Sequence, residues 1–325
     1  MSNIDNNFPP SKSFWLVTGG GGYIGGHMMQ ALNESRISSV LLDIDAVSAK
    51  NKITDLALYE NCDIRNKSSL AQVFSRHSIE GVIHLAALKS VRQSQEFRNE
   101  YFQTNVVGTK NILDLMVDFD VKKIVFSSTA AVYEAQTESN LIDEDSPLNP
   151  ISYYGQTKLE AERIISEYSA KHAIRSIILR YFNVGGSLNS NLKDTSIENL
   201  IPITISKLKS GSTPEIFGDD YETLDGTAIR DYVDVRDVTS AHMLAIDYLS
   251  GKSNSQILNI GTGKGHSVLE IINLTQKVMG IHKAPLIMGR REGDISTITA
   301  DISLAKKVLG FETKFDLLEM IQTSI

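Results

Sequence analysis

The sequence contains only one cysteine, Cys62, in 325 residues, so no disulfide can form within the chain. A lone thiol suits a reducing compartment, and we therefore expect a cytoplasmic protein with Cys62 as a small buried side chain. The seven histidines form neither an HExxH motif nor a Cys/His cluster with the spacing of metal ligands. The sequence therefore argues against a disulfide framework and against a metal site.

Long apolar runs and basic runs are also absent. No apolar stretch approaches the ~20 residues that a membrane-spanning helix needs. The 32 basic and 39 acidic side chains give a net charge of −7, which argues against a surface that binds nucleic acid or anionic lipid. The first residues, MSNIDNNFPPSK, are polar and lack an apolar signal core, so residues 1–12 are expected to be a disordered tail. We expect neither a membrane nor a nucleic acid as a partner.

Apolar runs alternate with amphipathic stretches over residues 13–133. The runs FWLVTG, SVLLDID, ALYENCDI, GVIHLAA and KKIVFSST are typical of buried strands. Between them, helical spacing predicts helices over Ile24–Glu34, Ser68–His77 and Val106–Phe119. Nearly continuous apolar strands that alternate with helices indicate a parallel sheet covered on both faces. The predicted fold is therefore α/β, with a doubly wound, Rossmann-type parallel sheet.

The alternation of apolar runs and amphipathic stretches ends at about Gly185, where the polar loop GGSLNSNLKDTSIEN begins. Beyond it, helical stretches over 200–208, 238–249 and 268–279 alternate with short strands such as RDYVDV and QILNIGTG. We predict a first domain over residues 13–184 and a smaller mixed α/β C-terminal domain over 185–325. Part of 233–262 is expected to return to the first domain.

A glycine-rich turn, TGGGGYIGG, lies between the first predicted strand and the first predicted helix. Such a turn lets backbone N–H groups approach a pyrophosphate at a helix N-terminus, whose dipole favours anions. Two registers are open: Gly20, Gly22 and Gly25 fit G-x-G-x-x-G, while Gly19, Gly22 and Gly25 fit G-x-x-G-x-x-G. The turn alone also fits an ordinary strand-to-helix connection.

Asp43 ends the second predicted strand, eighteen residues after Gly25. A carboxylate there can accept hydrogen bonds from the adenosine ribose of a dinucleotide. It would repel a 2′-phosphate, Asp45 would add to that repulsion, and no arginine stands beside them in the sequence. The pattern therefore predicts NAD rather than NADP as cofactor, and residues 13–184 as the NAD-binding domain.

Tyr154 and Lys158 stand four residues apart at the start of a predicted helix, so they share one helix face. A phenol is a poor base at neutral pH because its pKa is about 10, and a nearby ammonium lowers that pKa. The pair therefore suits a general base that removes a proton from a hydroxyl. The preceding strand ends in SST, so Thr129 or Ser128 could hydrogen-bond the same substrate oxygen.

Together these motifs resemble the extended short-chain dehydrogenase/reductase family, and within it the branch of UDP-sugar 4-epimerases. The resemblance rests on the stretches VTGGGGYIG, GVIHLAALKSV, NVVGT, FSSTAAVY, YYGQTKLEAE, LRYFN, IFGDDYETLDGTAIRDYVDVRDV and RREGD. They occur in family order and cover residues 14–316. The segment FGDDYETLDGT with RREGD is far more specific than any glycine pattern.

The resemblance implies roles for individual residues. Catalysis falls to Tyr154 as acid/base, to Lys158 and to Thr129, which stands where the family usually has serine. The NAD-binding residues would be Gly19, Gly22, Tyr23, Ile24, Gly25, Asp43, Asp63, Ile64, Leu85, Ala86, Ala87, Lys89, Asn105, Tyr154, Lys158 and Phe182. The UDP-sugar would be held by Thr129, Asn183, Asn199, Leu200, Ile216, Phe217, Arg230, Arg291, Asp294 and Ile298. The arginines suit this role because a guanidinium binds phosphate in a bidentate way.

The implied reaction is epimerisation at C4 of a UDP-sugar, with UDP-glucose and UDP-galactose as the expected pair, in a homodimer. Tyr154 would remove the proton of the 4-hydroxyl while hydride passes to bound NAD, and the transient 4-keto sugar would turn over before it is reduced again. Epimerases of UDP-GlcNAc, UDP-glucuronate or UDP-pentoses share this mechanism and remain alternatives. A decarboxylase or a non-catalytic NAD-binding protein is a further alternative. A 4,6-dehydratase is disfavoured, because Ala130 and Ala131 follow Thr129 where it needs acidic residues.

The sequence departs from the family pattern in a few places. Glu134 replaces a usual glycine, and the loop after Asn183 continues with Val184 instead of proline. The residues after Asp43 lack the usual asparagines, which puts the adenosine contacts there in doubt. Ile298 stands where a large aromatic commonly limits the pocket, so an N-acetylated sugar could fit.

Overall fold

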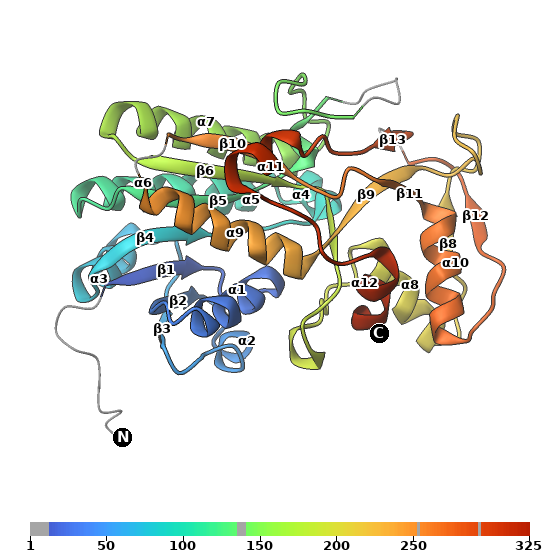
Figure 1. Cartoon of the computed structure of the whole chain (residues 1–325), viewed down its shortest axis with the longest axis horizontal. Coiled ribbons are helices and arrows are strands. Elements are labelled where there is room, and N and C mark those ends of the chain that lie inside the picture. The colour runs from blue at the N-terminus through green and yellow to red at the C-terminus, as the bar shows by residue number, and fades with distance from the viewer. Residues whose placement is uncertain (1–12, 135–140, 252–253, 292–293) are drawn as a thin grey trace.

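A computed structural model describes residues 13–134, 141–251, 254–291 and 294–325. The tail predicted over residues 1–12 lies outside this range. Figure 1 shows a large sheet sandwiched between helices, with a smaller group of strands and helices beside its one end.

The large sheet has seven strands in the order β10-β6-β5-β4-β1-β2-β3, and each neighbouring pair is parallel. Their bounds are β1 Phe14–Thr18, β2 Ser39–Asp43, β3 Ala57–Asn61, β4 Ile79–His84, β5 Lys123–Thr129, β6 Arg175–Tyr181 and β10 Gln256–Ile260. The order reverses next to β1, as it does in doubly wound dinucleotide-binding sheets. The predicted fold class is therefore confirmed.

Helices cover both faces of this sheet because each strand contributes apolar side chains to both. On one face, α1 (Tyr23–Glu34), α9 (Val235–Ser250) and α11 (Ser303–Leu309) enclose a core that includes Met28, Leu41 and Val238. On the other face, α3 (Lys67–Arg76), α6 (Gly108–Asp118) and α7 (Tyr153–His172) enclose a second core with Leu16 and Ile112. Burial of both faces explains why the strands read as almost continuous apolar runs.

The smaller part contains a four-stranded sheet and a two-stranded sheet. The first is formed by β7 (Asn183–Gly185), β9 (Ile229–Asp234), β11 (Gly265–Ser267) and β13 (Thr297–Ile298), and the second by β8 (Glu215–Phe217) and β12 (Leu286–Met288). Helices α8 (Leu200–Lys209), α10 (Val268–Met279) and α12 (Leu317–Ser324) pack around them with a core of Ile201, Ile271 and Met320.

The remaining elements are short. They are α2 (Ala46–Lys50), α4 (Val91–Glu96), α5 (Arg98–Phe102), the π-helix η1 (Gln103–Val107) and the 3₁₀-helices η2 (Ala130–Val132) and η3 (Ser190–Leu192). The helix predicted over Val106–Phe119 is therefore preceded by a π turn, and its α-helical part begins two residues later. Among the described residues, no helix combines the length and apolarity needed to cross a membrane.

Two elements from the later part of the chain contribute to the large sheet. Strand β10 pairs with β6 at the sheet edge, and α9 packs against α1. The chain therefore leaves the large sheet after β6, forms β7 to β9 in the smaller part, and comes back. The boundary at residue 185 stays a prediction, since the polypeptide crosses between the two parts more than once.

Candidate active site

The glycine-rich turn joins β1 to α1 and has two positions that only glycine can occupy. Gly19 has a positive φ of 72°, and a Cβ there would lie 2.7 Å from the Ala86 backbone nitrogen. A Cβ on Gly25 would lie 2.2 Å from the Gly19 carbonyl oxygen. Helix α1 is capped by Gly22, so no side-chain oxygen occupies its N-terminus. The turn thus presents backbone N–H groups to an anion, as a bound pyrophosphate requires.

Asp43 lies at the carboxyl end of β2, directly beside this turn. Its Oδ2 accepts a hydrogen bond from the Gly21 N–H at 2.9 Å, and its Oδ1 accepts one from the Asp45 N–H at 3.0 Å. Lys52, which the sequence analysis did not single out, donates from Nζ to the Gly21 and Gly22 carbonyls at 3.0 and 3.1 Å. Nothing in its sequence context marks Lys52, since only folding brings it back to the turn.

Burial lowers the pKa of Lys52, while the charges of Asp43, Asp194 and Asp45 act in the opposite direction. A cation therefore stands beside the two carboxylates that were expected to exclude a 2′-phosphate. The carboxylates outnumber it, which keeps the local charge suited to NAD.

The predicted cofactor residues after β4 line the next part of the same sheet edge. The Leu85 N–H donates to the Thr18 carbonyl at 3.1 Å, and the Ala86 N–H donates to Thr18 Oγ1 at 3.3 Å. Asn105 holds this segment from η1, because it donates to the Leu88 carbonyl and accepts from the Leu88 N–H. Ala87 follows directly and is half-buried.

At the end of β3, the Asp63 carboxylate pairs with Arg65, and Ile64 is buried against Gly108. Parallel strands bring their carboxyl ends to one edge. The turn, Asp43, Asp63 and the segment after β4 thus fit a dinucleotide as one continuous set.

The polar loop of the smaller part crosses over the start of α1. Tyr23 donates from its hydroxyl to the Gly186 carbonyl at 2.5 Å, and the Leu188 N–H donates to His27 Nε2 at 3.0 Å. On the other side, Lys89 Nζ donates to Ser196 Oγ at 3.0 Å. Hydrogen bonds therefore connect the loop between β7 and α8 to both sides of the sheet edge that carries the glycine-rich turn. The predicted residues Tyr23, Ile24 and Lys89 thus lie where the large sheet and the smaller part of the molecule meet.

Tyr154 and Lys158 lie on adjacent turns at the start of α7, in the predicted arrangement. The helix begins after Ser152, whose Oγ accepts the Gly155 N–H at 3.0 Å. The Thr129 side chain, at the end of β5, lies beside the Tyr154 phenol. The Lys158 ammonium lies 4.4 Å from the centroid of the Phe126 ring, in a cation–π contact.

Burial changes the pKa of both groups. It raises the pKa of the Tyr154 phenol to about 12, although the adjacent Thr129 side chain acts to lower it. It lowers the pKa of Lys158 to about 7, against the charge of Glu162, which raises it. The sequence predicted a lowered Tyr154 pKa, but burial is the dominant effect and leaves this pKa raised. The phenol needs further positive charge beside it before it can act as a base near neutral pH.

The structure distinguishes the two hydroxyls that the sequence left open. Thr129 is half-buried and faces Tyr154, whereas Ser128 is 2% exposed and donates to the Glu162 carboxylate inside the protein. Thr129 is therefore the hydroxyl available to a substrate oxygen beside Tyr154.

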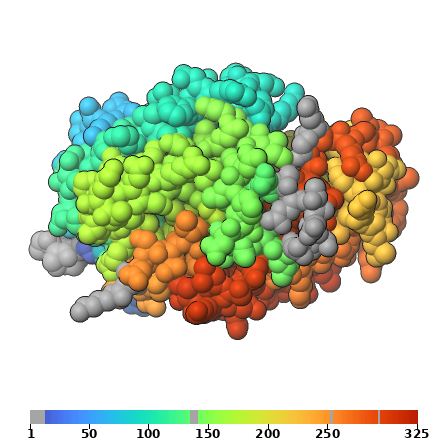
Figure 2. Space-filling view, turned by 90° about the horizontal axis from the view of Figure 1, so that it is seen from above, coloured from blue at the N-terminus to red at the C-terminus, as the bar shows by residue number. Residues whose placement is uncertain are grey.

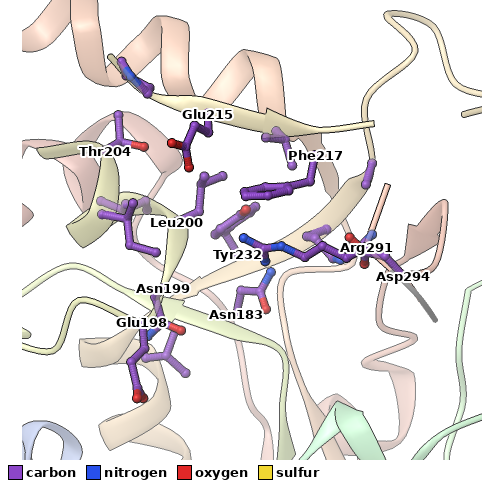
Figure 3. Close-up of a pocket in the computed structure, with 17 residues that line it drawn as sticks. Asn183, Glu198, Asn199, Leu200, Thr204, Glu215, Phe217, Tyr232, Arg291 and Asp294 are labelled. Carbon is purple, nitrogen blue, oxygen red and sulfur yellow. The ribbon is translucent and has the colours of Figure 1, made fainter. Parts of the chain in front are cut away.

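A pocket of about 290 Å³ lies in the smaller part, between α8, β8, β9 and the segment around Arg291. Seven predicted substrate residues line it: Asn183, Asn199, Leu200, Phe217, Arg230, Arg291 and Asp294. Figure 3 shows Phe217 and Arg291 close together near the centre of the view, with Leu200, the first residue of α8, and the preceding Asn199 to their left. The remaining lining residues, which sequence reasoning missed, are Val184, Glu198, Ile201, Ile203, Thr204, Pro214, Glu215, Ala228, Tyr232 and Val268.

Cations and an aromatic ring give this pocket its chemistry. The Arg291 guanidinium lies 3.8 Å from the centroid of the Phe217 ring, and Arg230 pairs with Asp294. Guanidinium groups bind phosphate in a bidentate way, and an aromatic face suits a nucleobase. The pocket therefore fits the nucleoside diphosphate end of a sugar nucleotide.

The other predicted residues are buried or lie nearer the reaction centre. Ile216 is 2% exposed, so its side chain belongs to the core beneath the pocket. Phe182 and Ile298 pack in a cluster with Ala130 and Leu159, next to the strand end that carries Thr129. Ile298 thus lies on the reaction-centre side of the pocket, where the size of a sugar could matter.

Metal-ligating clusters and the cysteine are the remaining candidates for chemistry. Within residues 13–134, 141–251, 254–291 and 294–325, no three His, Cys, Asp or Glu side chains form a group that could hold a metal ion. Cys62 is 5% exposed and unpaired, and burial raises its pKa to about 11. It is therefore an unreactive core residue.

Comparisons with known proteins agree with this geometry. A family model described as the NAD dependent epimerase/dehydratase family matches residues 15–261. A UDP-glucose 4-epimerase of Halalkalibacterium halodurans is 40% identical over 309 residues, which are 94% of this chain and 92% of that protein.

Solved structures give the same result. A UDP-glucose-4-epimerase from Stenotrophomonas maltophila, with bound NAD and formylated UDP-arabinopyranose, has a TM-score of 0.90 and 37% identity, covering 96% of each chain. A UDP-glucose 4-epimerase from Bifidobacterium longum, in complex with NAD+ and UDP, has a TM-score of 0.87 and 34% identity, covering 96% of this chain and 97% of the other. The resemblance seen in the sequence is confirmed, and the chain belongs to the NAD dependent epimerase/dehydratase family.

Proposed function

We propose that the protein catalyses the NAD-dependent epimerisation of a UDP-sugar at C4, with UDP-glucose and UDP-galactose as its substrates. The observation that carries this proposal is the position of Tyr154. Its phenol lies beside the Thr129 side chain at the end of β5, next to the NAD-binding edge of the sheet. Strand β6 pairs with β5, and the chain continues from the end of β6 through Phe182 to Asn183, which lines the arginine-containing pocket. A sugar joined to a nucleotide in that pocket would extend toward Tyr154.

Different residues would bind the UDP-sugar and carry out the reaction. Arg230 and Arg291 would bind the diphosphate, and Phe217 would support the base. Tyr154 would remove the proton of the 4-hydroxyl while Thr129 holds the same oxygen, and it would return a proton when the sugar is reduced again. When bound, NAD supplies a hydride acceptor and donor at C4, and its glycine-turn, Asp43 and Asn105 contacts would hold it through both steps.

The net reaction is redox-neutral, so NAD would remain bound as a prosthetic group. The hydrogen bonds between the β7–α8 loop and α1 support retention of NAD, because they cross the sheet edge where the dinucleotide would lie. The 4-keto sugar must rotate in the site, which requires a firm hold on UDP and a weaker hold on the sugar. The charged groups of the described pocket lie at the nucleotide end, in agreement with this division.

The sugar can be identified directly. Purified protein is incubated separately with UDP-glucose, UDP-GlcNAc and UDP-glucuronate, and the products are resolved by chromatography. We expect UDP-galactose from the first, with Tyr154→Phe as the inactive control. Turnover of UDP-GlcNAc would show that Ile298 leaves room for an N-acetyl group. Absence of product from all three, in protein that contains no NAD, would rule out the epimerase proposal.

We also propose a homodimer formed through the face of α4, α5 and α7. Figure 2 shows the helices of residues 91–118 beside α7 on one face of the molecule. Exposed apolar side chains occur there, including Phe97 (49% exposed), Phe102 (41%) and Ile151 (52%). A groove of about 420 Å³ between Phe102, Leu148 and Tyr153 adds to this apolar surface. Burial of such a face against a second copy would remove apolar area from water.

The proposed cellular location is the cytoplasm, because the only cysteine is unpaired and suits a reducing compartment. Fractionation of cells that express the tagged chain tests this location. Recovery of the chain with membranes or in the secreted fraction would contradict it.

A further inference from the structure

The loop between β7 and α8 joins the NAD-binding edge of the sheet to the arginine-containing pocket. Its buried residue Leu192 packs on α1 so closely that a Cβ on Gly26 would lie 2.9 Å from the Leu192 Cδ2 atom. The loop ends at Asn199, which directly precedes α8 and lines the pocket. A side chain within this loop can therefore influence both binding regions.

Asp194 lies between Leu192 and Asn199, and its side chain is only 8% exposed. Its Oδ1 accepts hydrogen bonds from the Ser196 N–H at 3.0 Å and from Ser196 Oγ at 2.6 Å. Its Oδ2 accepts a hydrogen bond from Nδ2 of the Asn199 side-chain amide at 3.2 Å. Both carboxylate oxygens thus bind groups of the same loop, and one of these groups belongs to a residue of the pocket.

A cation from the NAD-binding edge lies beside this carboxylate. The Lys89 ammonium, in the segment after β4, is 3.8 Å from Asp194 Oδ2 and donates to Ser196 Oγ at 3.0 Å. An opposite charge at this distance offsets part of the negative charge of Asp194. The pairing therefore reduces the repulsion between Asp194 and an anionic ligand of the pocket.

Asn199 occupies the N-cap position of α8 without capping the helix. An asparagine at this position usually accepts, through its side-chain oxygen, a hydrogen bond from the N–H of the second or third helical residue. Within the described start of α8 the Asn199 side chain makes no such bond, and its amide donates to Asp194 instead. Asp194 therefore holds this amide in an orientation that differs from the capping one.

The start of α8 consequently lies at the pocket without the Asn199 side-chain oxygen on its N–H groups. The first three helical residues are Leu200, Ile201 and Pro202, and proline has no N–H. The N–H groups of Leu200 and Ile201 have no carbonyl partner within the helix, and both residues line the pocket. Since N–H groups at a helix start favour an anion, they would act together with Arg230 and Arg291 on the diphosphate.

We propose that Asp194 is a positioning residue for the UDP-sugar: it holds the Asn199 amide away from the start of α8 and leaves the Leu200 and Ile201 N–H groups open to the diphosphate. This role rests on the proposed function, because it requires that the pocket binds the UDP end. Loss of the Asp194 carboxylate lets the Asn199 oxygen cap the helix, where it competes with the ligand for the same N–H groups.

Isothermal titration calorimetry with UDP, on the full chain supplied with NAD, measures the effect. Asp194→Ala should raise the Kd for UDP by about 10-fold, the usual worth of one hydrogen bond to a charged group. Asp194→Asn keeps an acceptor oxygen for the Asn199 amide and should have a Kd between those of Asp194→Ala and the unmodified protein. In turnover assays Asp194→Ala should raise KM for the UDP-sugar and leave kcat nearly unchanged, because the nucleotide end is bound equally in the ground and transition states.

A double-mutant cycle tests whether Asp194 acts through Asn199. Once Asn199→Ala has removed the side chain that can cap α8, the further change Asp194→Ala should alter the Kd for UDP by less than about twofold. The matched control is Asp247→Ala, which removes the same charge from an exposed site on α9 and should leave the Kd unchanged.

An unchanged Kd for UDP in Asp194→Ala overturns the proposal. An effect of Asp194→Ala that is equally large with and without the Asn199 side chain also overturns it, as does equal weakening by Asp194→Asn and Asp194→Ala. Loss of fold in both Asp194 variants, judged by circular dichroism and NAD content, would show that Asp194 is purely structural.

The same titrations separate this role from the proposed function. A protein that binds UDP but converts no UDP-sugar contradicts the proposed function, while the double-mutant cycle still decides the role of Asp194. An unmodified protein that does not bind UDP contradicts both.

Discussion

Tyr154 and Lys158 occupy adjacent turns of one helix, and burial moves their pKa values in opposite directions. The Tyr154 pKa rises to about 12 and the Lys158 pKa falls to about 7. Both shifts favour the neutral form, because a low-dielectric site disfavours charge. Burial thus keeps the Tyr154 phenol protonated near neutral pH and weakens the charge of Lys158, so a further positive group beside Tyr154 is needed to favour its phenolate. Oxidised NAD would be such a group.

Replacement of Tyr154 by phenylalanine removes the proposed acid/base while the ring remains. We expect kcat to fall by about 10²–10⁴-fold, the usual worth of a positioned acid/base. The measurement is a coupled assay for UDP-galactose conversion. Tyr153→Phe, one residue earlier on the helix, is the matched control and should retain activity. Near-normal turnover by Tyr154→Phe would show that another group transfers the proton.

Removal of the lysine charge tests its influence on the phenol. Lys158→Met should move the optimum of the kcat–pH profile to higher pH, because the phenolate loses a neighbouring cation. The NAD content of the variant must be measured in parallel, since Lys158 is also a predicted NAD ligand. A profile with an unchanged optimum would mean that Lys158 does not tune Tyr154.

At the scale of elements, the β1–α1 turn shows how a close backbone approach dictates residue type. A Cβ on Gly25 would overlap the Gly19 carbonyl oxygen, which belongs to the backbone and cannot move aside. The close packing of the start of α1 against the turn therefore depends on Gly25. The orientation of the N–H groups that would face a pyrophosphate depends on it as well.

Gly25→Ala should consequently lower both stability and NAD content. We expect destabilisation of about 1–3 kcal/mol, the cost of overpacking in a closely packed site, measured by urea unfolding. Gly251→Ala is the control, because its φ is −79° and the added Cβ would meet only the Tyr248 carbonyl at 3.6 Å. A Gly25→Ala protein as stable and as rich in NAD as the unmodified chain would contradict this role.

At the scale of the whole molecule, several histidines are buried in the neutral form. Burial lowers the pKa of His84 to about 3 and that of His242 to about 4. His242 connects α9 to β6 through a 2.6 Å hydrogen bond with the Tyr181 hydroxyl. An unfolded histidine binds a proton at a pKa of about 6.5, so acid favours the unfolded chain.

The free energy of unfolding should therefore fall as pH drops from about 6.5 toward 4. Each such histidine contributes a slope of about 1.4 kcal/mol per pH unit once the unfolded side chain is protonated. Asp237 opposes this trend, because burial raises its pKa to about 6.

Unfolding in urea at a series of pH values measures the slope, and His242→Gln should reduce it. His282→Gln is a control on an exposed histidine of the loop after α10. Equal slopes for the unmodified protein and His242→Gln would show that His242 titrates normally in the fold.

The proposed homodimer is also tested at the scale of the whole molecule. Phe102→Asp places a charge on the proposed α4–α5–α7 interface and should convert a dimer into monomer, as measured by light scattering during gel filtration. Phe119→Asp, on the 41%-exposed Phe119 at the end of α6, tests a second exposed phenylalanine and should leave the dimer intact. A monomeric unmodified protein would contradict the interface.

The sequence alone determined the doubly wound sheet, because apolar runs that alternate with amphipathic stretches have few other solutions. The spacing of Tyr154 and Lys158 predicted an acid/base pair, while Thr129 and the arginines were predicted through the family resemblance; their roles stay predictions. The tertiary structure decided what depends on contacts between distant segments. Lys52 returns to the glycine turn, Glu198 and Thr204 line the pocket, and Ser128 rather than Thr129 turns inward to Glu162.

The same reason explains the charges at the reaction centre. A motif places Lys158 one turn after Tyr154, but burial depends on the strands and helices that enclose the pair. Only the folded chain shows that Arg180 and Glu162, eighteen residues apart, form a buried bidentate ion pair between β6 and α7. Local sequence fixes which groups lie on one helix face, while desolvation and pairing are properties of the whole packed structure.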